Sequence, residues 1–450
     1  MLEFLLNIIQ TPAIVLGLVA LIGLVLQKKS FSQVFSGTLK TSLGMLVLAA
    51  GSSLIVTEIL PFVSLFTDVF HLSGFATSSE AVVGAMQSSV VVIASTSSLI
   101  MAIGFLVNVV IARLSPLKYI FLTGHMMWIL SVVIAFSLYV SEFNETMIIA
   151  IGSVLQGVIM VILPAIAQPL VRKLTGNNNI ALAHLTTLGT VPAAYVGGLV
   201  GDKSKSAEDL KLPESLEFFK DTSMSVSIVM GIFYLIVVIA AGPDKVAKLA
   251  GETNYIVFGL LKAMGFTAGI LILLQGVRMF LGELVPAFKG ISDKLVPGAV
   301  PALDVPAIFG FAPNSLMIGF VTAVLGMIVA MFVSSALFGV VPLVSIIGAF
   351  FTGGVAGILG NATGGRRGAV VSGFIYGFLL IVGSAFVFTL FDFAAYGVSG
   401  VGLDCIDVMV ILTIMKQPYI GMGIIAIVFA LLCVKEVKWK KDEAKKLEKQ

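Results

Sequence analysis

Charged residues are scarce in this sequence. Only 11% of its 450 residues are Asp, Glu, Lys or Arg, whereas 58% are hydrophobic. A soluble domain carries about 25% charged residues and could not hide this much apolar surface from water. The chain is therefore expected to be a membrane protein.

Cysteine is also rare, and the motifs of several function classes are missing. Cys405 and Cys433 lie far apart without the spacing of a metal site or redox pair, which favours plain apolar membrane residues. The sequence shows no phosphate-binding loop, no regular arginine ladder and no Cys/His cluster. We therefore expect a transporter rather than an enzyme, with no catalytic residues, no cofactor, no metal and no nucleic-acid partner.

Apolar stretches that are long enough to cross a hydrocarbon core recur along the chain. One crossing needs about 20 residues, and basic residues gather in loops on the cytoplasmic side. The clearest candidates are residues 12–27, 88–112, 119–140, 146–167, 226–242, 254–281, 315–337 and 369–390. They predict an all-α polytopic membrane protein of about eleven transmembrane helices, with the N-terminus outside and the C-terminus inside.

Four more apolar stretches are interrupted by Gly, Pro, Ser or a charge. They are residues 61–86, 180–200, 283–311 and 396–416. Irregular backbone at membrane depth is tolerated only where protein or a water-filled cavity satisfies it. We therefore expect re-entrant or half-helical segments here, close to a binding site.

A weak internal repeat divides the chain into two halves, about 1–220 and 221–415. Gly51 and Glu58 recur as Gly276 and Glu283 at a constant offset of 225 residues. Five predicted crossings separate the copies, so the copies have opposite orientations. Inverted repeats that flank a site near the midplane are a recurrent plan among transporters.

Ionisable residues within the membrane are functional candidates by default. Glu80 and Asp304 lie among small and turn-forming residues, and the repeat offset brings them within one position of each other. A carboxylate accepts hydrogen bonds from two sugar hydroxyls, and the neutral imidazoles of His125 and His184 both donate and accept. A helix cap or ion pair for the carboxylates, and helix–helix hydrogen bonds for the histidines, are the alternatives. Trp128 suits either a sugar face or the lipid interface.

Several longer motifs lie in order between about residues 36 and 320. They are Lys40-Thr-Ser-Leu-Gly44, Ala50-Gly-Ser-Ser53, Leu122-Thr-Gly-His125, Glu208-Asp-Leu-Lys-Leu-Pro213, Gln275-Gly-Val-Arg-Met-Phe280, Pro297-Gly-Ala-Val300 and Phe311-Ala-Pro-Asn314. This set resembles the ascorbate-specific enzyme IIC proteins of the phosphotransferase system.

The resemblance implies a homodimer in the bacterial cytoplasmic membrane, in contact with membrane lipid. Each protomer would have a core domain that carries the sugar in an elevator-like movement and a V-shaped scaffold domain, within residues 1–435. Residues 436–450 would form a charged cytoplasmic tail. The resemblance also implies separate cytoplasmic partners, IIB and IIA, which receive phosphate from enzyme I and HPr; IIB would phosphorylate the sugar.

The family's substrate contacts carry over by position. The predicted substrate-binding residues are Glu80, Ala81, His125, Met126, Met127, Trp128, Ile129, His184, Leu185 and Asp304. Ile129 and Leu185 stand where the family has glutamines, and Glu80 stands where it has a threonine. These differences remove two amide groups and add a carboxylate, which disfavours an anion. A neutral polyol therefore competes with L-ascorbate as the expected substrate.

A second hypothesis comes from another class of transporter. A proton-coupled secondary transporter of a small polar solute would use Glu80 and Asp304 as its proton relay. Neighbouring genes for IIA and IIB would favour group translocation over this alternative.

Overall fold

The computed structural model describes residues 11–69, 75, 77, 79–210, 222–391, 393–396, 398, 400–413 and 418–447. Within this part of the chain, seven helices are long and apolar enough to cross a membrane, or eight if the bent pair α9 (Thr222–Ala241) and α10 (Pro243–Ala250) counts as one span. The seven lie in α3 (Phe31–Val69), α5 (Val91–Leu114), α7 (Glu145–Thr175), α11 (Tyr255–Lys294), α13 (Pro313–Phe338), α15 (Gly354–Leu390) and α17 (Pro418–Leu447). The predicted class, an all-α polytopic membrane protein, is confirmed.

The count is lower than eleven partly because some apolar stretches form short helices. The short apolar helices are α2 (Pro12–Leu26), α6 (Gly124–Val140) and α8 (Thr187–Val200). At a rise of about 1.5 Å per residue, helices of 14 to 17 residues fall short of a full crossing.

The count is also lowered by a reversal inside α15. Gly364 and Gly365 leave the helical conformation, and Gly365 has φ +60°. The backbone of Gly360 then lies against that of Gly368, although these residues would be about 12 Å apart in a continuous helix. The residues at 361–367 therefore connect two helices, as the sequence predicted.

Short elements fill the places where we expected broken segments. The helices and helical turns are α4 (Ser79–Ser89), α12 (Pro306–Phe309), α14 (Ile346–Gly348), η2 (Ala349–Gly353), η3 (Phe393–Tyr396), η4 (Leu403–Cys405) and α16 (Ile406–Leu412), and the strands are β1 (Tyr119–Phe121), β2 (Ala181–Leu182) and β3 (Val300–Leu303). The prediction was wrong at the start of two segments, because α3 continues through Pro61 and α11 continues through Pro286.

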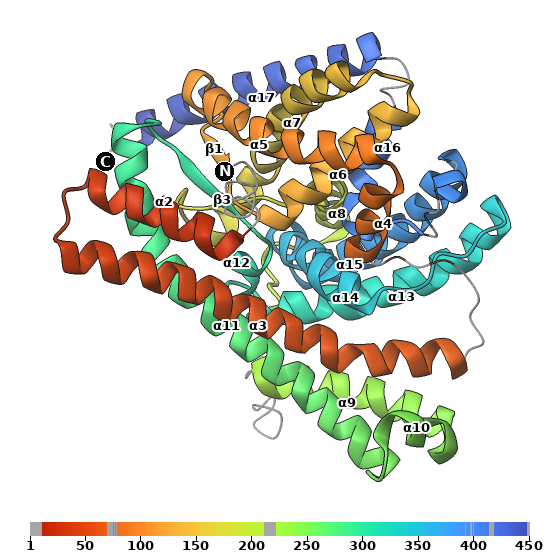
Figure 1. The fold of residues 1–450 in the computed structure, drawn as a ribbon. Coiled ribbons are helices and arrows are strands. Elements are labelled where there is room, and N and C mark those ends of the chain that lie inside the picture. The colour runs from red at the N-terminus through yellow and green to blue at the C-terminus, as the bar shows by residue number, and fades with distance from the viewer. Residues whose placement is uncertain are drawn as a thin grey trace.

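Helices α3 and α11 lie side by side and antiparallel along one flank of the molecule (Figure 1). A Cβ on Gly51 would lie 2.3 Å from the backbone nitrogen of Leu273, and a Cβ on Gly276 would lie 2.2 Å from that of Leu48. Only glycine allows this approach, as in other close membrane helix pairs. Both contacts are related by the offset of 225 residues, so the repeat seen in the sequence is a structural two-fold.

Two ion pairs on the same helices follow this symmetry. Glu58 pairs with Lys262 at 3.0 Å, and Glu283 pairs with Lys40 at 3.1 Å. The equivalent carboxylates therefore each bind a lysine on the opposite helix. This outcome agrees with the ion-pair alternative for such carboxylates and removes Glu283 from the candidates for sugar contact.

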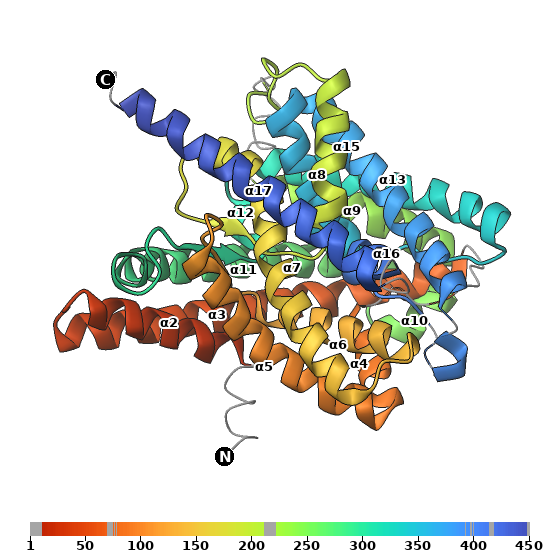
Figure 2. The same ribbon diagram turned by 90° about the horizontal axis from the view of Figure 1, so that it is seen from above.

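The remaining helices pack beside the α3–α11 pair. Helices α2, α9 and α10 accompany the pair, whereas α4 to α8 and α12 to α17 form a second group (Figures 1 and 2). In the second group, α15 packs against both α8 and α13, and α5 packs against α7.

The C-terminal helix α17 is fastened to the second group by a buried cluster. Arg172 Nη2 lies 2.7 Å from Glu436 Oε1, and each side chain is about one-tenth exposed. Arg172 also donates to the Tyr119 hydroxyl at 3.1 Å and lies 3.3 Å from the ring centre of Trp439. The solvated tail that we expected from residue 436 begins instead as a docked helix, because Arg172 supplies a partner for Glu436.

Candidate functional site

Three short strands bring the predicted site residues together. The strands pair in parallel in the order β1-β3-β2, with Ile120 opposite Pro301 and Leu182 opposite Leu303. Parallel strands place their carboxyl ends at one edge. His125, His184 and Asp304 follow β1, β2 and β3 by four, two and one residues, so all three lie at that edge.

Two histidines and two carboxylates converge there. Asp304 Oδ2 lies 3.6 Å from His125 Nε2, and Asp304 Oδ1 lies 3.9 Å from His184 Nε2. Asp404 Oδ1 lies 3.9 Å from the same His184 nitrogen. His125, Asp304 and Asp404 are partly exposed, whereas the His184 side chain is only 3% exposed.

These separations leave room for a ligand. A hydrogen bond joins heavy atoms at about 2.7–3.2 Å, and 3.6–3.9 Å is longer. The facing oxygen and nitrogen atoms are thus close enough for one hydroxyl to bridge them. Several bridging hydroxyls are what a sugar or polyol offers.

Trp128 lies next to this cluster in sequence and is held by a polar contact. Its Nε1 donates to Gln87 Oε1 at 2.9 Å, and the Gln87 amide donates to Ser97 at 3.2 Å. The indole is partly buried. This anchoring from α4 and α5 fits a ring of fixed orientation better than a lipid-facing residue; Gln87 was not predicted.

The second half repeats the strand arrangement in a less regular form. Phe75 bridges Pro342 in parallel, as β3 pairs with β1. The Leu403 N–H donates to the Thr77 carbonyl at 3.3 Å, and the Ala183 N–H donates to the Leu303 carbonyl at 2.7 Å. Asp404 follows Leu403 as His184 follows Ala183. Asp404 therefore occupies the position in the second half that His184 occupies in the first.

Sequence reasoning missed Asp404, although it carried a usable signal. It lies in the predicted broken segment 396–416, and a carboxylate within such a segment is a functional candidate by default. Its amide donates to Ser79 Oγ at 3.0 Å. The single offset of 225 residues concealed it, because Asp404 and His184 are 220 positions apart.

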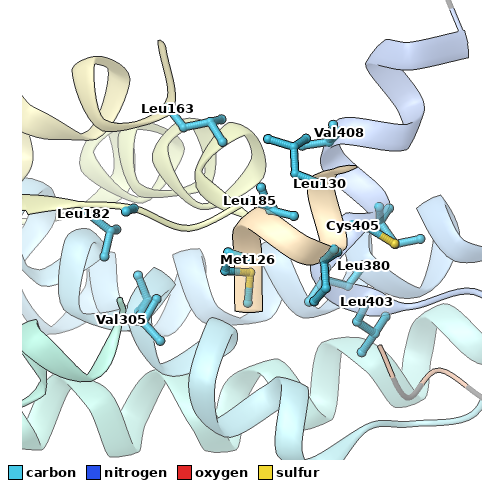
Figure 3. Packing of buried hydrophobic residues seen from close by; sticks show 14 of the residues in the cluster. Met126, Leu130, Leu163, Leu182, Leu185, Val305, Leu380, Leu403, Cys405 and Val408 are labelled. Atoms are coloured by element: carbon cyan, nitrogen blue, oxygen red, sulfur yellow. The ribbon is translucent and has the colours of Figure 1, made fainter. Parts of the chain in front are cut away.

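Four of the predicted site residues have side chains in the hydrophobic core. Met126, Met127, Ile129 and Leu185 are at most 2% exposed and belong to the main apolar cluster. Figure 3 shows Met126 and Leu185 among the apolar side chains of this cluster. Of these positions, Ile129 and Leu185 replace glutamines of the resembling family; here they extend the apolar packing behind the polar cluster.

Glu80 and Ala81 belong to the first turn of α4, but their side chains lie outside the described residues. Ligand contact by them stays a prediction. In the described part of the chain, no group of three or more His, Cys, Asp or Glu is arranged to hold a metal ion.

Comparison with known proteins gives two findings. Residues 7–404 match the family model described as "EIIC-GAT: PTS system sugar-specific permease component". The chain is also 27% identical, over 431 residues, to the "Ascorbate-specific PTS system EIIC component" of Mycoplasma pneumoniae (strain ATCC 29342 / M129 / Subtype 1). That alignment covers 84% of this chain and 64% of the relative, so the chain spans less than two thirds of the relative's length.

Proposed function

Because this chain belongs to the sugar-specific permease component family of the phosphotransferase system, we propose that it carries L-ascorbate or a related polyol into a bacterial cell. A separate IIB subunit, supplied with phosphate through IIA, HPr and enzyme I, phosphorylates the sugar on the cytoplasmic side. The relative named for ascorbate supports this substrate class.

The observation that carries the proposal is the convergence of His125, His184, Asp304 and Asp404 between the two inverted halves. His125 and His184 come from the first half, and Asp304 and Asp404 come from the second. A site built jointly by both repeats is the expected place for alternating access. Its facing acceptors and donors suit hydroxyl groups rather than an apolar solute.

The arrangement of the helices supports elevator-like movement. All four residues belong to the second group of helices, and none belongs to α2, α3, α9, α10 or α11. The sugar site could then move as one body against the α3–α11 pair. We assign a homodimer in the cytoplasmic membrane on the family resemblance, with the exposed apolar faces of the long helices in contact with lipid or the second protomer.

Vesicle uptake with a panel of sugars tests the function. Inverted vesicles are unsuitable, so right-side-out vesicles are loaded with phosphoenolpyruvate and the soluble partners and supplied with labelled L-ascorbate or neutral pentitols. We expect phosphorylated product inside, dependent on phosphoenolpyruvate and insensitive to an uncoupler over the first minutes. Asp304→Asn should abolish most of the uptake, whereas Asp209→Asn, an exposed carboxylate, should not.

The competing function predicts a different product. The cluster of histidines and carboxylates contains groups that exchange protons, which favours a proton-coupled transporter as the second candidate. Accumulation of unmodified sugar that an uncoupler abolishes would support that candidate and contradict group translocation.

A further inference from the structure

A line of polar side chains leads away from His184, on the side opposite the sugar. His184 Nδ1 lies 2.7 Å from Thr186 Oγ1. Thr186 also interacts with the hydroxyl group of Tyr376, and that hydroxyl donates to Asp407 Oδ2 at 3.2 Å. The four side chains therefore connect the site to a carboxylate on α16.

The middle of this line is buried and its two ends are not. His184, Thr186 and Tyr376 are at most 2% exposed, whereas Asp407 is partly exposed. Its neighbours in the chain, Ile406 and Val408, belong to the hydrophobic core. A carboxylate in such surroundings is unfavourable unless it has a function or a partner.

The backbone is built to bring Asp407 close. The Gly189 N–H donates to Asp407 Oδ2 at 2.6 Å. A Cβ on residue 189 would lie 2.3 Å from a ring carbon of Tyr376 and 2.9 Å from Asp407 Oδ2. Glycine is therefore required at this first turn of α8 for the tyrosine and the carboxylate to meet there.

The direction of the hydrogen bonds depends on the proton of Asp407, because each hydroxyl has one hydrogen to donate. When Asp407 is ionised, Tyr376 donates to it, Thr186 donates to Tyr376, and His184 Nδ1–H donates to Thr186. The Nε2 atom of a neutral ring then has a free lone pair.

A proton on Asp407 reverses the order. Asp407 then donates to Tyr376, Tyr376 to Thr186, and Thr186 to His184 Nδ1. The Thr186 backbone N–H, 3.3 Å from Nδ1, supports this second arrangement. The ring now carries its hydrogen on Nε2, which faces the sugar site.

We propose that Asp407 is a positioning residue that decides, through Tyr376 and Thr186, whether His184 Nε2 accepts or donates a hydrogen bond at the sugar site. With a bare Nε2, the nitrogen and the Oδ1 atoms of Asp304 and Asp404 are three acceptors around one space. That set binds the hydroxyl donors of a neutral polyol. With a hydrogen on Nε2, the site gains a donor for an anionic oxygen such as that of ascorbate.

The charged and titratable groups around the line are few. His184 faces Asp304, Asp404 and His125, and Asp407 faces Tyr376 and Asp404. These groups shift the pH at which the switch occurs. They do not replace the hydroxyl line, because only Thr186 is hydrogen-bonded to Nδ1 among the described residues.

The test uses ¹⁵N-labelled histidine in the full chain, reconstituted in lipid bilayers. The sequence has three histidines, so replacing the other two in turn assigns the His184 signals. Solid-state ¹⁵N spectra distinguish the two neutral tautomers and the imidazolium. In the wild type, we expect the neutral His184 ring to change tautomer as the pH is varied.

Matched variants isolate the line from general damage. Thr186→Val and Tyr376→Phe should hold one tautomer at every pH, whereas Thr186→Ser, which keeps the hydroxyl, should behave as the wild type. A wild-type ring that keeps one tautomer throughout, or a Thr186→Val ring that still switches, would overturn the proposal. Size-exclusion chromatography checks that each variant is folded.

The substrate consequence rests on the proposed function and is measured separately. Calorimetry of the wild type should show the ascorbate-to-pentitol affinity ratio changing about tenfold with the tautomer, which corresponds to one hydrogen bond gained or lost. Thr186→Val should show a constant ratio. If the tautomer switches but neither ligand binds, the relay stands and the proposed substrate class fails.

Discussion

Replacing Glu436 by glutamine should release the cytoplasmic end of α17. Glu436 forms the 2.7 Å ion pair with Arg172, and its Oε2 accepts from the Tyr119 hydroxyl at 3.3 Å. Glutamine keeps the shape and one hydrogen bond but removes the charge, so Arg172 stays buried without its counter-ion. Breaking a fully buried pair costs about 3–5 kcal/mol, and the loss of one charged hydrogen bond costs about 1.5–3 kcal/mol.

The expected loss is about 2–3 kcal/mol, because Arg172 keeps other partners. Asn178 Oδ1 accepts from Arg172 Nε at 2.7 Å, and the Trp439 ring still covers the guanidinium. A loss of this size raises the population of the undocked helix roughly 30- to 150-fold. Amide hydrogen exchange in the segment of α17 beyond residue 436 measures that population directly.

The control is Asp442→Asn, an exposed carboxylate on the same helix, which should change exchange little because exposed ion pairs contribute about 0–1 kcal/mol. Equal exchange in Glu436→Gln and the wild type would refute the assigned role of the buried cluster. Faster exchange over the whole protein would instead indicate that the variant unfolds globally.

Three further predictions follow from the fold and the site. Asp304→Asn should weaken sugar binding roughly 10- to 150-fold, as for the loss of one charged hydrogen bond of about 1.5–3 kcal/mol, measured by calorimetry; unchanged affinity would remove Asp304 from the site. Gly51→Ala should destabilise the α3–α11 contact by about 1–3 kcal/mol through overpacking, whereas Gly282→Ala, whose Cβ would meet nothing within 4 Å, should leave the thermal midpoint in detergent unchanged or higher. A cysteine at Glu145 should react with an impermeant reagent from outside intact cells and one at Lys203 should not; the reverse pattern would overturn the predicted orientation.

The helical part of the fold was readable from the sequence because long apolar runs have few other solutions in a membrane. The three strands were not. They are two to four residues long, too short for an alternating pattern to show. Pro61 and Pro286 also misled the analysis, because a proline within a well-packed membrane helix is compatible with its continuation.

The candidate site was half readable. His125, His184 and Asp304 stood out as ionisable or polar groups in apolar segments, and the structure brings them together. Asp404 did not, because the offset between the halves is 225 residues at Val300 and Phe75 but 220 at Asp404 and His184. Differences in loop length change the offset along the chain, and a sequence compared with itself at one offset cannot show them.

The strand order has a consequence for synthesis. β3, from the second half, lies between β1 and β2 of the first, and Phe75 and Thr77 of the first half contact residues 341–343 and 403 of the second. A nascent chain that ends near residue 220 thus holds strand edges with no partner for their N–H and C=O groups, which a bilayer does not tolerate. The transport site is then the last part to be assembled, after residue 404 has been inserted. Each half acts as the template on which the other completes its fold, so the halves expressed as separate chains should reach their final form only in the same membrane.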